Sequence, residues 1–445
     1  MDEKKNTSDQ TGPAIWPPPG FVELLAMSSH ASGFKRENAV RRLGMLGNPL
    51  ALPYLIERAN DWVPQVRAAA RDALSKLLRA ENAEAFVTAL PELLHLRTCL
   101  RDDHTALVQA VQDFLLHEEN VHHLLAGLHS PDVQVARVAA RWLVERSRVA
   151  PAAIVAAGLS NKDAIVRSTV IDLLGRLDEQ TLGTWIAKAL GDPYMPVRRE
   201  AFQHLLVQDV EAGLRVARDM LFDRSASIRE IAVRRLLDAG APVEQLYDSA
   251  LVSGRGRVAI VTCVLWSWAF MNCKGRSDQV RMLLGSRSAS VRGAALQTIA
   301  RLLGDEAATD LEAALADVSP AVCKEAARLV IKSNAVLGAD RLVTLAQSSG
   351  LTHVAIACCR VARSVNKWEW LKFVLKVYGA PDAAVDKETL SNEIDAWDEQ
   401  FNRSNAQPDA ASLLQIVFAL HACENKLTAD QLRVLKFTLK GYAAN

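Results

Sequence analysis

The sequence has no excess of charge of either sign. Its 445 residues contain 52 Lys and Arg residues against 51 Asp and Glu residues. A balance this close creates no overall field that would attract nucleic acid or an anionic membrane, so such binding would need local segregation of charge. We therefore do not expect nucleic acid or a membrane among the partners.

Long apolar runs are also missing. No stretch has the length of a membrane-spanning segment, and the opening residues MDEKKNTSDQ lack the apolar core of a secretory signal. The seven cysteines are odd in number and scattered, without the spacing of a disulfide framework or a zinc site. These absences predict a cytoplasmic protein in a reducing compartment.

Recognisable catalytic motifs are absent as well. There is no nucleophile elbow, phosphate-binding glycine loop or dinucleotide fingerprint. The densest histidine region, HEENVHH, places His117 and His122 five residues apart, whereas a zincin helix needs a spacing of four. We favour a solvated turn there, and we expect no catalytic residue, metal or cofactor.

What the sequence does contain is a repeat of about 31 residues. It is carried by a branched aliphatic residue, here called the anchor, that opens a helix in each unit. The anchors are Val66, Val108, Val135, Val166, Val197, Ile228, Val258, Val291, Val322 and Val354, and a degenerate first unit places Val40 in the same role. The gap of 42 residues between Val66 and Val108 predicts an irregular unit with an inserted helix at ENAEAFVTALPELLHL.

Three other columns keep step with the anchors. A small polar residue stands five positions before most anchors, a small residue such as Ala70 stands four after, and a large apolar residue such as Leu74 stands eight after. Anchors and the positions four and eight later share one helical face, which predicts the seam between stacked helical hairpins. A hairpin alone buries too little apolar surface, so stability must come from stacking. The sequence predicts an all-α fold, an α-solenoid or superhelical array of about ten hairpins.

The two ends lack the repeat. Residues 1–20 combine charge with a proline cluster beside Trp16 and predict a flexible tail. The solenoid then covers residues 21–364. Residues 365–445 contain NKWEWLKFVLKVYG, an acidic connector and two further helices, the last with Thr428 and Gln431 at capping-box spacing. We interpret this region as a C-terminal helical cap.

The segments DWVPQVRAAARDAL, DPYMPVRREAFQHL, DRSASIREIAVRRL and SRSASVRGAALQTI resemble HEAT repeats, in particular the bilin-lyase type. The resemblance covers Phe21 to Ser364. It implies a ladder in which an arginine after the anchor binds Asp or Ser side chains of the turns between helices. The arginines are Arg67, Arg167, Arg198, Arg229 and Arg292, and the ladder should be interrupted at Gln109, Ala136, Ala259, Cys323 and Ala355.

HEAT arrays serve scaffolds, transport factors, a few enzymes and DNA-repair proteins, so the resemblance leaves function open. Because no catalytic constellation accompanies it, we favour a non-catalytic scaffold or adaptor that binds a protein partner along the concave surface. A bilin-lyase-related enzyme and a nucleic-acid-binding HEAT protein are the alternatives.

The candidate binding residues lie two and six positions past the anchors, where positive charge predominates. If these helices line the inner curve, they form a mildly basic stripe suited to an acidic segment of another protein. Its basic members are Arg137, Arg141, Arg199, Arg234, Lys324 and Arg328. The alternative, which we favour, is an ordinary solvated helix face. Trp266 occupies the core column, whereas Trp268 points elsewhere and is either an interface anchor or, as we favour, a packing residue.

Overall fold

The computed structural model describes residues 20–254, 257–333, 337–380 and 387–443, and within these ranges it contains helices and no strand. Two compact units divide the chain, Met1–Val216 and Ala217–Asn445. The predicted tail, with Trp16, lies outside the described residues apart from Gly20. No helix in the described ranges combines the length and apolarity needed to span a bilayer.

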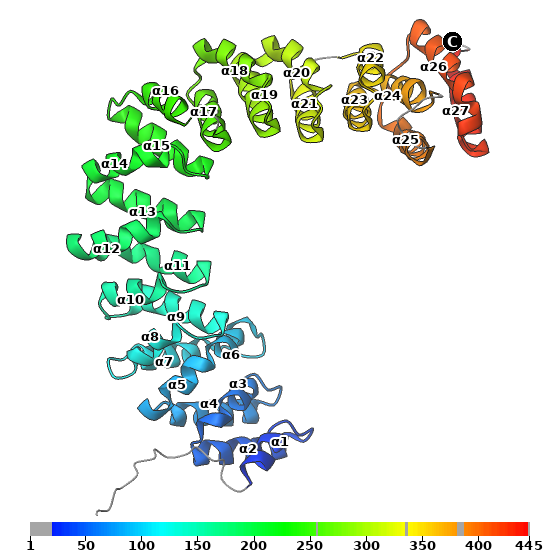
Figure 1. The fold of residues 1–445 in the computed structure, drawn as a ribbon. Coiled ribbons are helices and arrows are strands. Elements are labelled where there is room, and N and C mark those ends of the chain that lie inside the picture. The colour runs from blue at the N-terminus through cyan, green and yellow to red at the C-terminus, as the bar shows by residue number, and fades with distance from the viewer. Residues whose placement is uncertain (1–19, 255–256, 334–336, 381–386, 444–445) are drawn as a thin grey trace, which may run out of the picture. The chain divides into compact units, whose positions relative to one another are not determined.

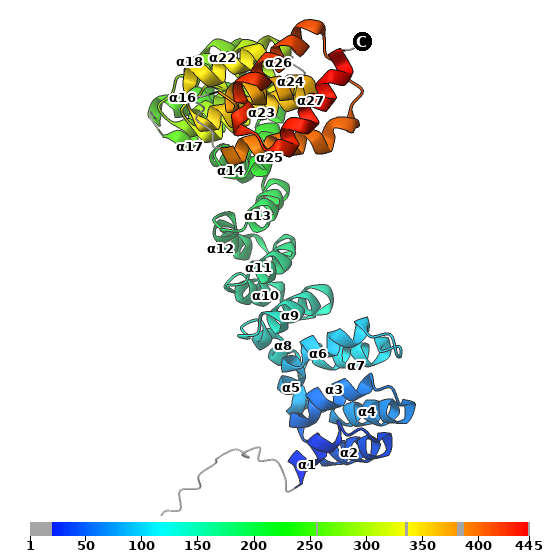
Figure 2. The same ribbon diagram turned by 90° about the vertical axis from the view of Figure 1, so that its right-hand side faces the viewer.

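Helices follow one another along the first unit in chain order (Figure 1). They are α1 (Phe21–Met27), α2 (Gly33–Leu46), α3 (Leu52–Ala59), α4 (Pro64–Leu77), α5 (Ala83–Thr88), α6 (Leu90–His95), α7 (Thr105–Leu115), α8 (Val121–Gly127), α9 (Val133–Arg146), α10 (Pro151–Gly158), α11 (Ala164–Val170), α12 (Glu179–Leu190) and α13 (Met195–Gln208). Helix α14 (Val210–Met220) continues from the first unit into the second. In Figure 2 the hairpin of α3 and α4 lies beside that of α1 and α2, as stacking requires.

The second unit continues the pattern. Its helices are α15 (Ala226–Asp238), α16 (Val243–Ser253), α17 (Val258–Phe270), α18 (Ser277–Leu284), α19 (Ala289–Leu303), α20 (Ala308–Ala314), α21 (Pro320–Lys332), α22 (Ala339–Ser349), α23 (Thr352–Val365), α24 (Lys367–Phe373), α25 (Lys387–Gln400), α26 (Ala410–Cys423) and α27 (Ala429–Ala443). Helices α18, α20 and α22 form one layer and pack on α19, α21 and α23, which also pack on one another (Figure 1). The predicted all-α array of HEAT-like hairpins is confirmed.

The predicted seam is the core of this array. Apart from Val258, every anchor from Val66 onwards is buried, and so are the small residues four positions after them, Ala70, Ala139, Ala201, Ala232, Ala295, Ala326 and Cys358. Small side chains are needed because neighbouring helices approach closely. At Gly44 of α2, an added Cβ would lie 2.6 Å from the Cβ of Ala73 in α4.

The prediction was wrong in register at α17. Val258 is 40% exposed, while Val264 and Trp268 are buried. Ile260, four residues before Val264 and eight before Trp268, is therefore the anchor of this unit. With this choice the gaps to Ile228 and Val291 become 32 and 31 residues, which fit the repeat better than 30 and 33.

Two other sequence-based expectations need correction in the first unit. Val40 is buried, but it is not the anchor position of this unit. In the other units the ladder arginine directly follows the anchor position. Here that arginine is Arg36, so the anchor position is residue 35, five residues before Val40. The inserted helix is two short helices, α5 and α6, because Pro91 stands at the start of α6 and has no N–H to continue α5.

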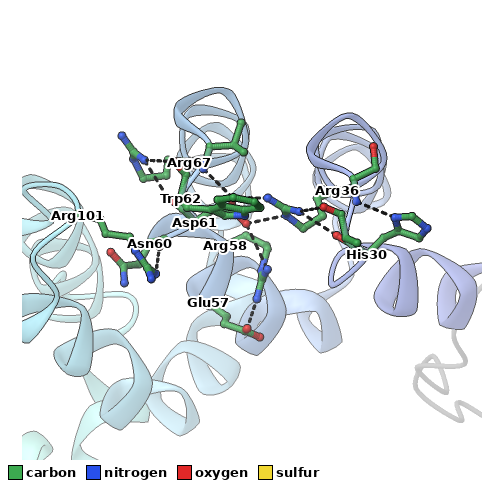
Figure 3. Close-up of polar contacts among 12 residues, drawn as sticks. His30, Arg36, Glu57, Arg58, Asn60, Asp61, Trp62, Arg67 and Arg101 are labelled. Atoms are coloured by element: carbon green, nitrogen blue, oxygen red, sulfur yellow. Dashed lines mark hydrogen bonds and ion pairs between the residues drawn. The ribbon is translucent and has the colours of Figure 1, made fainter.

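The arginine ladder links consecutive turns. Arg36 binds Asp61 through two hydrogen bonds of 2.8 and 2.7 Å and also donates to the carbonyl oxygens of His30 and Ala31 in its own turn (Figure 3). One guanidinium thus joins two neighbouring hairpins. Burial disfavours the charged form of Asp61, but the hydrogen bonds from Arg36 and from the Val63 N–H outweigh it and lower the pKa of Asp61.

The same geometry recurs at other members of the ladder. Arg167 binds Asp192 and Arg292 binds Asp317, in each case through two hydrogen bonds across 25 residues. Arg67 binds Asp102 across the irregular unit at 3.0 Å. Arg198 donates to carbonyl oxygens of its own turn, as Arg167 and Arg292 do.

At two of the five predicted interruptions another side chain supplies a contact. At Cys323 the thiol takes the arginine's place and donates to the Asp317 carbonyl oxygen at 3.1 Å. At Ala136 the neighbouring residue substitutes, because Arg137 binds Asp163 with hydrogen bonds of 3.1 and 2.8 Å.

The C-terminal region contains helices α24 to α27, with a non-helical segment at residues 404–409. The capping box is confirmed, since Thr428 and Gln431 exchange two hydrogen bonds of 3.2 Å. The segment expected to be an acidic connector is helix α25, whose Leu390, Ile394 and Trp397 are buried. That this region acts as a cap, with a boundary at residue 364, stays a prediction.

Candidate partner-binding groove

The basic stripe predicted from the sequence is largely neutralised within the chain. Most of its arginines bind a carboxylate, in the pairs Arg137–Asp163, Arg199–Glu200, Arg234–Glu230 and Arg328–Glu325. Arg141 and Lys324 are exposed and make no hydrogen bond or ion pair with any described residue. For all six basic residues of the stripe, a role in binding a partner stays a prediction.

Trp268 packs in the core, as we favoured from the sequence, and the alternative role as an interface anchor is wrong. Its side chain is only 1% exposed, because the shifted register of α17 turns it into the core column. Trp266, which we expected in that column, is half-buried instead. With the anchor at Val258, Trp266 was predicted in the core column and Trp268 outside it. The structure has Trp268 in the core column and Trp266 half-buried outside it.

Two adjoining cavities in the second unit form what we call the groove. The first, of about 640 Å³, is lined from α17 and α19 and by residues around the start of α15. The second, of about 500 Å³, is lined from α19, α21 and the residues that follow each of them. Gln297 and Arg301 of α19 border both cavities, so the groove crosses successive second helices of the hairpins.

Positive charge dominates the groove. Its lining contains Arg224, Arg229 and Arg301 in the first cavity, and Arg328 and Lys332 with Asp305 in the second. Arg301 and Lys332 are exposed and have no hydrogen bond or ion pair among the described residues. An acidic segment would find complementary charge here.

Trp266 lines the first cavity of the groove, and its ring stacks on that of Phe270, which is in the lining of neither cavity. The rings of Trp266 and Phe270 stack with centroids 5.2 Å apart and planes 7° from parallel. The guanidinium carbon of Arg229 lies 4.5 Å from the Trp266 ring, and that of Arg234 lies 5.5 Å from the Phe270 ring. These four side chains form a column of cation–π contacts between α15 and α17, here called the aromatic column. In it the electron-rich ring faces attract the guanidinium groups, which can also bind an anion.

Arg229 is the most deeply set cation of the groove. It is 8% exposed, and its Nη1 donates to the Asp223 carbonyl oxygen at 2.7 Å. Its buried Nε has no hydrogen-bond partner among the described residues. Cys263 lines the same cavity, and burial raises the pKa of its thiol, which keeps it protonated at neutral pH.

A separate cavity of about 490 Å³ lies in the first unit, beside Trp62. Trp62 is 68% exposed and faces the Arg36 guanidinium at 5.3 Å (Figure 3). The lining of this cavity contains charges of both signs. Glu57, Asp61 and Glu92 are acidic, and Arg58 and Arg101 are basic. This cavity therefore lacks the single sign of charge that distinguishes the groove.

The histidine-rich segment is divided between a turn and a helix. His117 lies in the turn before α8, whereas His122 and His123 lie on α8 with ring centroids 4.0 Å apart. The described residues contain no group of three or more His, Cys, Asp and Glu side chains that could hold a metal ion.

Sequence reasoning missed Trp266, Arg229 and Arg301 as groove residues. Arg301 lies ten positions past its anchor, and Arg229 had been assigned to the ladder. A usable signal was the turn SGRGR at residues 253–257, the one place in this part of the repeat where a ladder arginine meets a turn without an acidic residue.

Similarity to known proteins is found among solved structures. No family model matches the sequence, and no curated protein matches it. Among solved structures, the Escherichia coli protein YibA is 13% identical, with 60% of this chain and 99% of that chain covered and a TM-score of 0.32. The complex of CpcE and CpcF of phycocyanin lyase from Nostoc sp. is 16% identical, with coverage of 57% and 94% and a TM-score of 0.22. Kap121p is 14% identical, with coverage of 98% and 55% and a TM-score of 0.34.

Proposed function

We propose that the chain is a non-catalytic protein-interaction scaffold that holds an acidic segment of a partner protein in the groove of the second unit. The observation that carries this proposal is the groove's lining, where five basic residues, of which Arg328 is paired with Glu325, stand against one acidic residue, Asp305. The proposal keeps the scaffold function expected from the sequence and moves its binding site from the full stripe to this groove.

The contrast with the rest of the stripe supports the choice of site. Arg137 and Arg199 already hold a carboxylate of their own chain, so a partner would have to displace it. Arg301 and Lys332 hold none among the described residues. Unpaired cations raise the local concentration of an acidic segment and speed its association.

The aromatic column adds a contact that simple attraction lacks. Half-buried Trp266 borders the cationic cavity, and tryptophan and arginine are the side chains that most often dominate binding energy at protein interfaces. An acidic segment with an apolar residue among its carboxylates would use both. This pattern favours a protein partner over a nucleic acid, whose binding would need a longer uninterrupted basic track.

A photo-cross-linking experiment tests the proposal. Benzoylphenylalanine replaces Gln297, which borders both cavities, and in a control protein it replaces exposed Lys274 outside them. Irradiation in a lysate of the source cells should give a discrete protein adduct from position 297 and none from position 274. Mass spectrometry then identifies the partner and the segment attached.

Charge reversal provides the second arm. Arg301→Glu with Lys332→Glu should abolish the adduct, while the matched pair Lys274→Glu with Arg287→Glu should leave it unchanged. Persistence of the adduct after reversal of the groove would contradict the proposal. An adduct with nucleic acid, or a bound chromophore in the absorption spectrum, would favour one of the two alternative functions.

A further inference from the structure

Arg229 is the ladder arginine whose next turn offers no carboxylate. Arg36, Arg167 and Arg292 each bind an aspartate 25 residues further on. These aspartates stand five positions before the next anchor. The corresponding position before Ile260 is Arg255, and the turn sequence SGRGR has no acidic residue. The sequence therefore supplies no carboxylate for Arg229 at this hairpin.

The consequence is a buried guanidinium that lacks a carboxylate partner in the described part of the chain. Arg229 keeps the hydrogen bond to its own turn, at the Asp223 carbonyl oxygen, as the other ladder arginines do. Its Nε is buried and has no partner among the described residues, whereas Nε of Arg167 and of Arg292 binds a carboxylate at 2.7 Å. A mostly buried guanidinium without a counter-charge is costly, and a carboxylate placed beside it lowers that cost.

The cavity beside Arg229 suits this group. Arg229, Trp266 and Arg301 all line it, Thr262 and Gln297 add polar side chains, and its lining contains no Asp or Glu. A carboxylate that enters would meet arginines in a partly desolvated site, where charge-assisted hydrogen bonds are strongest.

We propose that Arg229 receives the side-chain carboxylate of an Asp or Glu in the partner's acidic segment, which completes the ladder from outside the chain. This inference rests on the proposed function, because it names the chemical group that the groove recognises. The partner thereby supplies the contact between neighbouring hairpins that the chain's own sequence omits.

A peptide titration tests the inference without knowledge of the partner. The probe is a fluorescein-labelled peptide of five Asp-Gly repeats, compared with five Asn-Gly repeats, and anisotropy is measured on the full chain at about 0.15 M salt, where weak surface attraction is screened. The Asp peptide should bind at least about tenfold more tightly than the Asn peptide, and Arg229→Gln should remove most of that difference. Lys274→Gln, which alters charge outside the groove, should bind as the parent does.

Two controls keep the result decisive. Circular dichroism establishes that Arg229→Gln is folded, and if it is not, Arg301→Gln, at an exposed position of the same cavity, replaces it and should weaken binding of the Asp peptide several-fold. Equal binding of both peptides, or an unchanged affinity in a folded variant of either arginine, would overturn the carboxylate assignment. If the adduct at position 297 still depends on the groove's charge, the proposed function survives and only this inference fails.

Discussion

Arg292 and Asp317 join two neighbouring hairpins by hydrogen bonds of 2.7 Å from Nε and Nη2 to the two carboxylate oxygens. The same guanidinium donates to the Ser286 carbonyl oxygen of its own turn at 2.8 Å. It therefore fixes the turn before α19 against the turn before α21. Arg36 and Asp61 repeat this arrangement in the first unit with both side chains fully buried, which makes that pair the better one to test.

Asp61→Asn should destabilise the first unit by about 3 kcal/mol, because it leaves the buried Arg36 guanidinium without its counter-charge. Denaturant unfolding measures the loss, and hydrogen exchange locates it in α2 to α4. Glu37→Gln is the matched control, since the Arg41–Glu37 pair is exposed and should contribute less than about 1 kcal/mol. Equal effects of the two substitutions would contradict a structural role for the ladder.

The contribution of Asp61 should depend on pH in a defined direction. Its pKa is lowered in the folded protein, despite burial, by hydrogen bonds from Arg36 and Val63. The stabilisation is therefore complete above the ordinary aspartate pKa of about 4 and is lost as the pH falls through the lower folded-state value. The difference in unfolding free energy between the parent and Asp61→Asn, measured from pH 7 to pH 3, should shrink below about pH 4. A constant difference would exclude this linkage.

Truncation of the two tryptophans of α17 should destabilise the protein by different amounts. Trp268→Ala should cost about 3–5 kcal/mol, because it empties a buried position of the core. Trp266→Ala should cost only about 1–2 kcal/mol, from the lost stacking on Phe270 and the contact with Arg229. Thermal or denaturant unfolding of the two variants decides between this register and the one anchored at Val258, which predicts the reverse order.

Two glycines in helix interiors should give opposite signs when replaced by alanine. Gly44→Ala should destabilise the protein, because the new Cβ would meet Ala73 at 2.6 Å. Gly293→Ala should stabilise it by up to about 1 kcal/mol, because nothing lies within 4 Å and alanine favours the helix. Both are measured by denaturant unfolding. A gain in stability from Gly44→Ala would mean that α2 and α4 pack less closely than described.

Thiol alkylation should be selective. Burial raises the pKa of Cys358 to about 12 and that of Cys323 and Cys423 to about 11, so these groups remain as unreactive thiols. Cys99 is half-buried and should be the first cysteine that iodoacetamide modifies at pH 8 in the folded protein. Peptide mapping at short reaction times measures the order. Rapid modification of Cys358 would show that α23 opens readily.

The fold could be predicted from the sequence because its signal is redundant. Anchors, small residues and large apolar residues recur together, so an error at Val258 did not hide the array. The same redundancy could not fix the register at α17, where Val258, Ile260 and Val261 are all branched and both tryptophans are large. Only the exposed fraction of each side chain distinguishes these candidates. That fraction depends on how the chain enters the helix from the preceding turn, which the sequence does not reveal.

The groove was harder to predict than the fold. Arg137 and Arg301 look alike in the sequence, yet Arg137 is bound by Asp163 of the next turn and Arg301 has no such partner among the described residues. Which cations remain free depends on pairings across about 25 residues and on the rotamers of long side chains. The missing acid after Arg229 was visible in the sequence, but its meaning required the geometry of its equivalents at Arg167 and Arg292.

The ladder also bears on how such a chain can change its length. The hairpin of α3 and α4 offers Asp61 to Arg36 of the hairpin before it and Arg67 to Asp102 of the unit after it, so its two faces are complementary to each other as well as to its neighbours. Duplication or loss of one whole regular unit would bring complementary faces together and would leave no buried charge without a partner. Evolution by whole repeats is therefore inexpensive at this seam, whereas an insertion that separates an arginine from its aspartate would need compensation in the same step.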